Sequence, residues 1–121
     1  MQFNRSAEVR LRHILEHIDA IRESTRNLTA EQISHDYLVI RALERSVEIV
    51  SEAAKAIPED IRIHEPDVPW KDIVGIGNLL RHEYYRIDQT RMVEILNGHL
   101  PKLRQAIVRL LASLDKSGTA D

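Results

Sequence analysis

Apolar residues recur every three or four positions along most of the chain, the spacing that lines one face of an α-helix. This period predicts helices over about residues 6–26, 30–57, 70–85, 88–96 and 100–114. Their expected core residues are Leu11, Ile14, Leu15, Ile18, Ile21, Ile33, Tyr37, Ile40, Leu43, Val47, Val50, Ala54, Ile73, Ile76, Leu80, Tyr84, Ile87, Met92, Val93, Leu96, Leu100, Leu103, Ile107, Leu110, Leu111 and Leu114. No run alternates apolar and polar residues as a half-buried strand does. The fold class predicted is all-α, an antiparallel up-and-down bundle of four to five helices.

Residues at the predicted helix ends agree with this division. Thr29, with Gln32 three residues later, forms a capping-box pattern at the start of the second helix. Pro69 suits the first turn of the third helix, and Asp88 can cap the short helix that follows. Asn97-Gly98 predicts a stop before the last helix.

The length and the second helix bear on domain organisation and assembly. A chain of 121 residues predicts one domain over residues 1–121, with residues 115–121 as a frayed tail. Beside its core positions, the helix over 30–57 carries a second stripe of mostly small residues. These are Ala42, Ser46, Ile49 and Ala53. Small side chains allow another helix to approach closely, either within the chain or from a second subunit. Because this helix carries more apolar surface than one small bundle needs, we expect a two-fold homodimer, with the helix over 70–85 at or beside its interface.

Composition narrows the class of protein. A net charge of −2 argues against a surface coated in positive charge, although it leaves room for a local basic cleft. No apolar run approaches the ~18 residues of a membrane span, and the N-terminus lacks a secretion signal. Cysteine is absent, which fits a cytoplasmic protein and excludes cysteine-ligated metals. His13 and His17 lie one turn apart without a third ligand, so no metal site is expected.

The most unusual side chains gather in residues 68–88, which hold the only tryptophan and two of the three tyrosines. At 100° per residue, one side of this helix carries polar and aromatic residues away from the apolar stripe. They are Asn78, Arg81, His82 and Tyr85. A histidine can move a proton near neutral pH, and an arginine fork can hold a phosphate, which suits phosphodiester chemistry. The alternative is an ordinary solvated face, with Tyr84 in the core.

The run from residue 37 to residue 111 resembles the HepT-like branch of the HEPN superfamily. The resemblance rests on an EAAK segment, a Pro-Trp pair and a Gly-x-x-Asn…His-x-Tyr pattern. In this chain these are Glu52–Lys55, Pro69-Trp70, and Gly75, Asn78, His82 and Tyr84. The resemblance implies a homodimeric helical bundle that acts as a metal-independent endoribonuclease toxin on RNA, without a cofactor. It also implies a partner, a nucleotidyltransferase-fold antitoxin known as MNT, which neutralises the toxin.

The resemblance also implies roles for individual residues. His82 matches the family's catalytic histidine, which acts as general acid and base. Asn78 matches the polar residue that follows the family's arginine. Tyr84 matches the tyrosine to which the antitoxin attaches AMP. Glu83 and Tyr85 lie alongside as supporting residues.

The chain departs from the family at the arginine, because the position five residues before His82 holds Gly77. Arg81, one helical turn further on and about 40° round, is the substitute phosphate-binding group that we expect. Gly77 itself has two explanations, close packing of another helix or room for a nucleotide, of which we favour packing. The rival function is a catalytically weak or silent binding module partnered with a nucleotidyltransferase.

Overall fold

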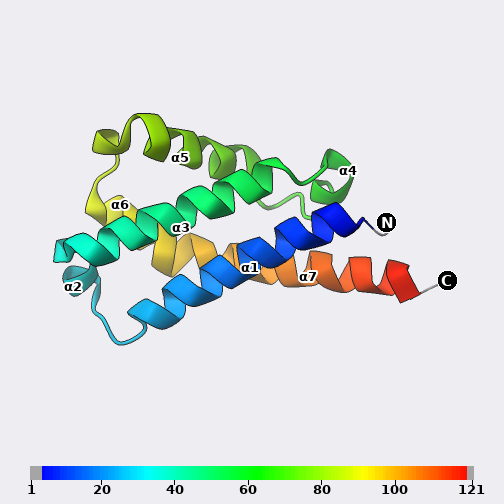
Figure 1. Cartoon of the computed structure of the whole chain (residues 1–121), viewed down its shortest axis with the longest axis horizontal. Coiled ribbons are helices and arrows are strands. Elements are labelled where there is room, and N and C mark those ends of the chain that lie inside the picture. The colour runs from blue at the N-terminus through cyan, green and yellow to red at the C-terminus, as the bar shows by residue number, and fades with distance from the viewer. Residues whose placement is uncertain (1–3, 120–121) are drawn as a thin grey trace.

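The computed structural model describes residues 4–119, and every regular element within that range is helical (Figure 1). In chain order the elements are α1 (Arg5–Thr25), α2 (Ala30–His35), α3 (Tyr37–Lys55), α4 (Glu59–Arg62), α5 (Trp70–His82), the 3-10 turn η1 (Tyr84–Arg86), α6 (Gln89–Glu94), the π-helical turn η2 (Ile95–His99) and α7 (Leu100–Thr119). The all-α prediction is confirmed.

Four long helices run alternately up and down, with α3 at the centre (Figure 1). α3 makes its most extensive contacts with α5 on one side and with α1 on the other, and α7 packs on α1. Apolar side chains from all four helices, from α6 and from η2 form one core. It includes Leu11, Ile14, Ile18, Leu43, Val47, Val50, Ala54, Leu80, Met92, Leu96, Leu103, Ile107, Leu110 and Leu114. The antiparallel bundle is therefore confirmed, and α5 lies on one flank of it.

The helix predicted over residues 30–57 is divided in two. The capping box at Thr29 is present and starts α2, but Asp36 adopts an extended conformation (φ −101°, ψ 111°) that ends it. The Asp36 carboxylate then accepts a hydrogen bond of 3.1 Å from the Val39 amide and caps α3. Tyr37, predicted to be in the core, lies just past this break and is 71% exposed.

The C-terminal part differs from the prediction in the opposite way. Asp88 caps α6 as predicted, accepting from the Arg91 amide at 2.8 Å. Asn97-Gly98 does not end the helical segment, because these residues lie in η2, which continues directly into α7. Leu96 in this turn and Leu100 at the start of α7 are both buried. α7 continues to Thr119, past the start of the expected tail, and residues 120 and 121 lie outside the described residues.

Candidate functional site

α5 approaches α3 closely at Gly77, which is buried. A Cβ atom at this position would lie 2.1 Å from Ser51 Oγ and 2.5 Å from Ser51 Cβ. The Ser51 hydroxyl occupies the space and donates a 3.1 Å hydrogen bond to the Val74 carbonyl of α5. Gly77 is therefore a packing glycine whose neighbour is α3 of the same chain, and it leaves no room for a nucleotide there. Gly75 differs, since its Cβ would meet no atom within 4 Å.

Arg81, one turn after Gly77, reaches across to α3. Its Nη1 donates to Glu52 Oε2 at 3.0 Å, and its Nη2 donates to Asn78 Oδ1 on α5. Its guanidinium is thus held by one residue from each helix. The structure brings Asn78 and Arg81 together, as their spacing predicted.

His82 is the last residue of α5, and its side chain is exposed. Within the described part of the chain, no hydrogen bond or ion pair engages its imidazole. Glu83 leaves the helical conformation (φ −143°, ψ 44°), although its amide still donates to the Leu79 carbonyl at 2.7 Å. The ring of His82 is therefore available to solvent at a helix end.

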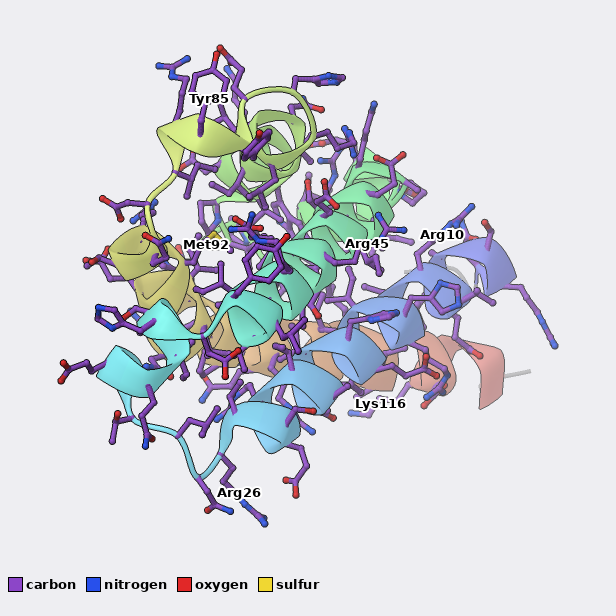
Figure 2. The ribbon with its side chains drawn as sticks, turned by 60° about the vertical axis from the view of Figure 1, so that its left-hand side comes forward. Arg10, Arg26, Arg45, Tyr85, Met92 and Lys116 are labelled. Atoms are coloured by element: carbon purple, nitrogen blue, oxygen red, sulfur yellow. The ribbon has the colours of Figure 1, made fainter. Side chains whose placement is uncertain are left out.

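The end of α5 at His82 overturns the prediction that Tyr84 lies in the core. Tyr84 and Tyr85 belong to η1, are 59% and 74% exposed, and meet edge to face with ring centroids 6.0 Å apart. Figure 2 shows Tyr85 at the outer margin of the molecule. Because the helical period stops at His82, Tyr85 does not share one α5 face with Asn78 and Arg81. The Tyr84 hydroxyl belongs to a largely exposed side chain.

Ion pairs neutralise the arginines on this flank. Each of four arginines from α3, α5 and η1 pairs with a glutamate. The pairs are Arg41–Glu44 at 2.9 Å, Arg45–Glu48 at 3.4 Å, Arg81–Glu52 at 3.0 Å and Arg86–Glu83 at 3.3 Å. Burial raises the pKa of the Glu44 carboxyl, and the Arg41 guanidinium acts against that shift. A phosphate that approaches Arg81 therefore meets a cation already partnered by a carboxylate.

Two surface hollows among the described residues lie away from Arg81 and His82. One is lined by α2, α6 and η2, and its lining residues include His35 and His99. The other lies at the end of α1 and includes Arg22, Arg26 and Arg104, the last of which pairs with Asp19 at 2.6 Å. Neither hollow includes a residue of α5 or η1. Arg81 and His82 are both exposed, and neither lines either hollow.

Two further properties concern the described residues as a whole. Among residues 4–119, histidines and carboxylates nowhere gather in a group of three suited to a metal ion. In the same range, none of the helices has the length and apolar character required to cross a bilayer.

Sequence reasoning missed two residues that shape this site. Ser51 sets the distance between α3 and α5, and Glu52 holds Arg81. By spacing alone, Glu52 would pair with Lys55, three residues later on the solvated face of its own helix. The EAAK segment that begins at Glu52 was the only signal that pointed to this residue.

An all-α bundle that presents an asparagine, an arginine and a histidine on the last turns of α5 fits the HEPN class of helical proteins. The comparison with protein families agrees, since residues 14–110 match the family described as "Ribonuclease HepT-like". This match runs from α1 to α7. The chain therefore belongs to the HepT-like family of the HEPN superfamily.

Curated relatives carry names of the same kind. A protein of Thermococcus cleftensis named "Probable ribonuclease HepT" is 30% identical over 106 residues, which cover 88% of this chain and 96% of that one. A "Putative RNase" of Caldanaerobacter subterraneus subsp. tengcongensis is 32% identical over 101 residues, 84% of this chain and 90% of that one. A protein of Methanocaldococcus jannaschii named "Gamma-glutamylcyclotransferase and putative RNase" is 29% identical over 113 residues, 93% of this chain but 51% of that longer protein. No solved structure matches the chain.

Proposed function

We propose that this protein is a metal-independent endoribonuclease in which His82 moves protons and Arg81 binds the phosphate. The observation that carries the proposal is the pair itself: a guanidinium held between α3 and α5, next in sequence to an exposed imidazole at the end of α5. Two of the five guanidinium N–H groups of Arg81 are engaged, so three remain for phosphate oxygens. The family match and the names of the relatives support RNA as the substrate.

The reaction follows from these two groups and from the substrate. His82, as general base, accepts the proton of the RNA 2′-hydroxyl, whose oxygen then attacks the adjacent phosphorus. The bond from phosphorus to the 5′-oxygen breaks, and a protonated imidazole or water supplies the proton that this oxygen takes up. Arg81 stabilises the charge that builds on the phosphoryl oxygens. The products are a 2′,3′-cyclic phosphate and a 5′-hydroxyl end.

The experiment that tests this function is cleavage of a single-stranded RNA by the purified protein in EDTA. The same sequence built from 2′-O-methyl nucleotides is the matched substrate, because it lacks the nucleophile. We expect cleavage of the RNA alone, and loss of that cleavage in His82→Ala. If wild type leaves the RNA intact, the binding-module function takes the place of the nuclease. The neutralised arginines and the glycine at position 77 are the observations that favour this second function.

We further propose a two-fold homodimer in which the two His82 side chains share one cleft. Within one chain, Ala53 is buried, which removes it from the predicted stripe, while Ala42 stays exposed and Ser46 and Ile49 partly so. Leu38, one turn before Ala42, extends this apolar surface of α3 and is 76% exposed. A second copy would cover these residues beside α5.

Substitution of Leu38 by glutamate is expected to weaken this dimer at least about tenfold, because a charge would be buried at an apolar contact. Light scattering at micromolar concentration measures the change. Val108→Glu is the matched control, since Val108 is 41% exposed on α7, away from α5, and its substitution should leave the dimer intact. A wild-type protein that is monomeric at this concentration would overturn the proposal.

We also propose that the protein is the toxin of a toxin–antitoxin pair and that an MNT-type nucleotidyltransferase neutralises it by adding AMP to Tyr84. The exposure of Tyr84 on η1 supports this, because a transferase must reach the hydroxyl. The Tyr84 oxygen would attack the α-phosphorus of ATP, with loss of its proton and release of pyrophosphate.

Tyr84→Phe is expected to lose AMP labelling when the protein is incubated with the nucleotidyltransferase and labelled ATP. Tyr85→Phe is the matched control, since Tyr85 is the adjacent tyrosine and is more exposed. It should be labelled as strongly as wild type. Equal labelling of wild type and Tyr84→Phe would place the modified group elsewhere.

A further inference from the structure

Among the described residues, Glu52 is the one residue outside α5 that forms a hydrogen bond or ion pair with the guanidinium of Arg81. We propose that Glu52 is a positioning residue, which holds Arg81 in the place and orientation needed to bind the phosphate. The proposal rests on the nuclease function proposed above. It assigns a role in that function to a carboxylate of α3 that never touches the substrate.

The packing of α3 on α5 explains why Glu52 can do this. Ser51, next to Glu52, touches Gly77, and Arg81 follows Gly77 by one turn. The contact of a hydroxyl with a glycine brings the two helices unusually close, so Arg81 and Glu52 meet at 3.0 Å. A larger residue at position 77 would increase this separation. Gly77 stands where the family has an arginine. By allowing α3 and α5 to pack closely, it also places Arg81, the proposed substitute for that arginine, against Glu52.

Two anchors fix a guanidinium better than one. Asn78 lies on the same helix as Arg81, three residues earlier, and its side-chain oxygen holds only one nitrogen of the fork. The bond from Glu52 to the other terminal nitrogen comes from a second helix and restricts rotation of the planar group. An exposed ion pair adds little to the stability of a fold. We therefore expect Glu52 to act mainly by keeping the Arg81 side chain in one conformation.

The charge of Glu52 gives the proposal a distinctive kinetic signature. Its carboxylate weakens the attraction between Arg81 and RNA, so Glu52→Gln should bind RNA as tightly as wild type or more tightly. The freed Arg81 would occupy the productive position less often, so kcat should fall. Small displacements of a catalytic group reduce rates by up to about 100-fold, and we expect a loss of about 10- to 100-fold in kcat without a rise in KM.

The control is Glu48→Gln, which removes the same charge one turn earlier on α3. Glu48 pairs with Arg45 instead of Arg81, at 3.4 Å. Its substitution should therefore change RNA binding through charge alone and leave kcat within about twofold of wild type. Glu52→Asp, which keeps the charge on a shorter side chain, should recover part of the kcat that Glu52→Gln loses.

The experiment measures cleavage kinetics together with the NMR signal of the Arg81 Nε–H group, assigned by its loss in Arg81→Lys. We expect Glu52→Gln to shift this signal and to accelerate its exchange with water, and Glu48→Gln to leave it unchanged. An Arg81 signal unaffected by Glu52→Gln, or a kcat that is unchanged or raised, would overturn the proposal.

The two proposals can fail separately. If wild-type protein does not cleave RNA, the nuclease function fails, and the role of Glu52 is decided by NMR with the 2′-O-methyl RNA. Addition of this RNA should perturb the Arg81 signal in wild type and Glu48→Gln, and perturb it less in Glu52→Gln. Equal perturbation in all three proteins would overturn the positioning role.

Discussion

Replacement of Gly77 by arginine is expected to destabilise the protein by about 3–5 kcal/mol instead of restoring the family's phosphate-binding group. The Cβ atom alone would lie 2.1 Å from Ser51 Oγ and 2.5 Å from Ser51 Cβ, and the second of these atoms is fixed by the backbone of α3. Either α5 moves away from α3 or a cation is buried between them. Both changes would also separate Arg81 from Glu52.

Urea unfolding of alanine variants measures the packing part of this effect. Gly77→Ala should lose about 1–3 kcal/mol, whereas Gly75→Ala, on the open side of the same helix, should gain about 0.5–1 kcal/mol from its better helix propensity. Ser51→Gly combined with Gly77→Ala should recover most of the loss, because it removes the atoms that clash. If Gly77→Ala proves as stable as Gly75→Ala, the close approach at Ser51 is not needed for the fold.

The helical period predicted the bundle because it records which side of each helix is buried. The core residues of α1, α3 and α7 follow it throughout, from Leu11 to Leu114. The helical period gave wrong predictions at two positions where a helix ends although the apolar spacing continues. At Asp36 a side-chain cap starts a new helix in nearly the same register, and at Glu83 the helix ends while apolar residues continue. Tyr37 and Tyr84, each just beyond such a break, were therefore assigned to the core although both are exposed.

Only those contacts of the candidate site that form within one helix could be predicted from the sequence. The bond between Asn78 and Arg81 follows from a spacing of three residues on α5. The partners supplied by α3 do not follow from spacing. Ser51 lies 23 residues from Val74 and Glu52 lies 29 residues from Arg81, and these residues meet only through packing. Charge spacing within α3 alone would instead pair Glu52 with Lys55, three residues later.

His82→Ala is expected to lower RNA cleavage by about 10²–10⁴-fold, the range contributed by a positioned proton-transfer group. Because His82 is exposed and makes no hydrogen bond to another described residue, its removal should leave the fold and the binding of 2′-O-methyl RNA unchanged. The loss should therefore appear in kcat, with KM nearly constant. His99→Ala is the matched control, since His99 is also exposed but lies on η2, at the hollow beside α2.

Arg81 variants distinguish the contribution of this residue to RNA binding from its contribution to turnover. Arg81→Ala should reduce cleavage by about 10²–10³-fold, by analogy with the loss of one preorganised donor to a developing oxyanion. Arg81→Lys keeps the charge but loses the planar fork that both Glu52 and Asn78 hold, so it should recover RNA binding more than turnover. If His82→Ala and Arg81→Ala both cleave RNA as fast as wild type and His99→Ala, the activity belongs to other residues. The end of α5 would then be a binding surface, and Arg81 would contact a partner protein.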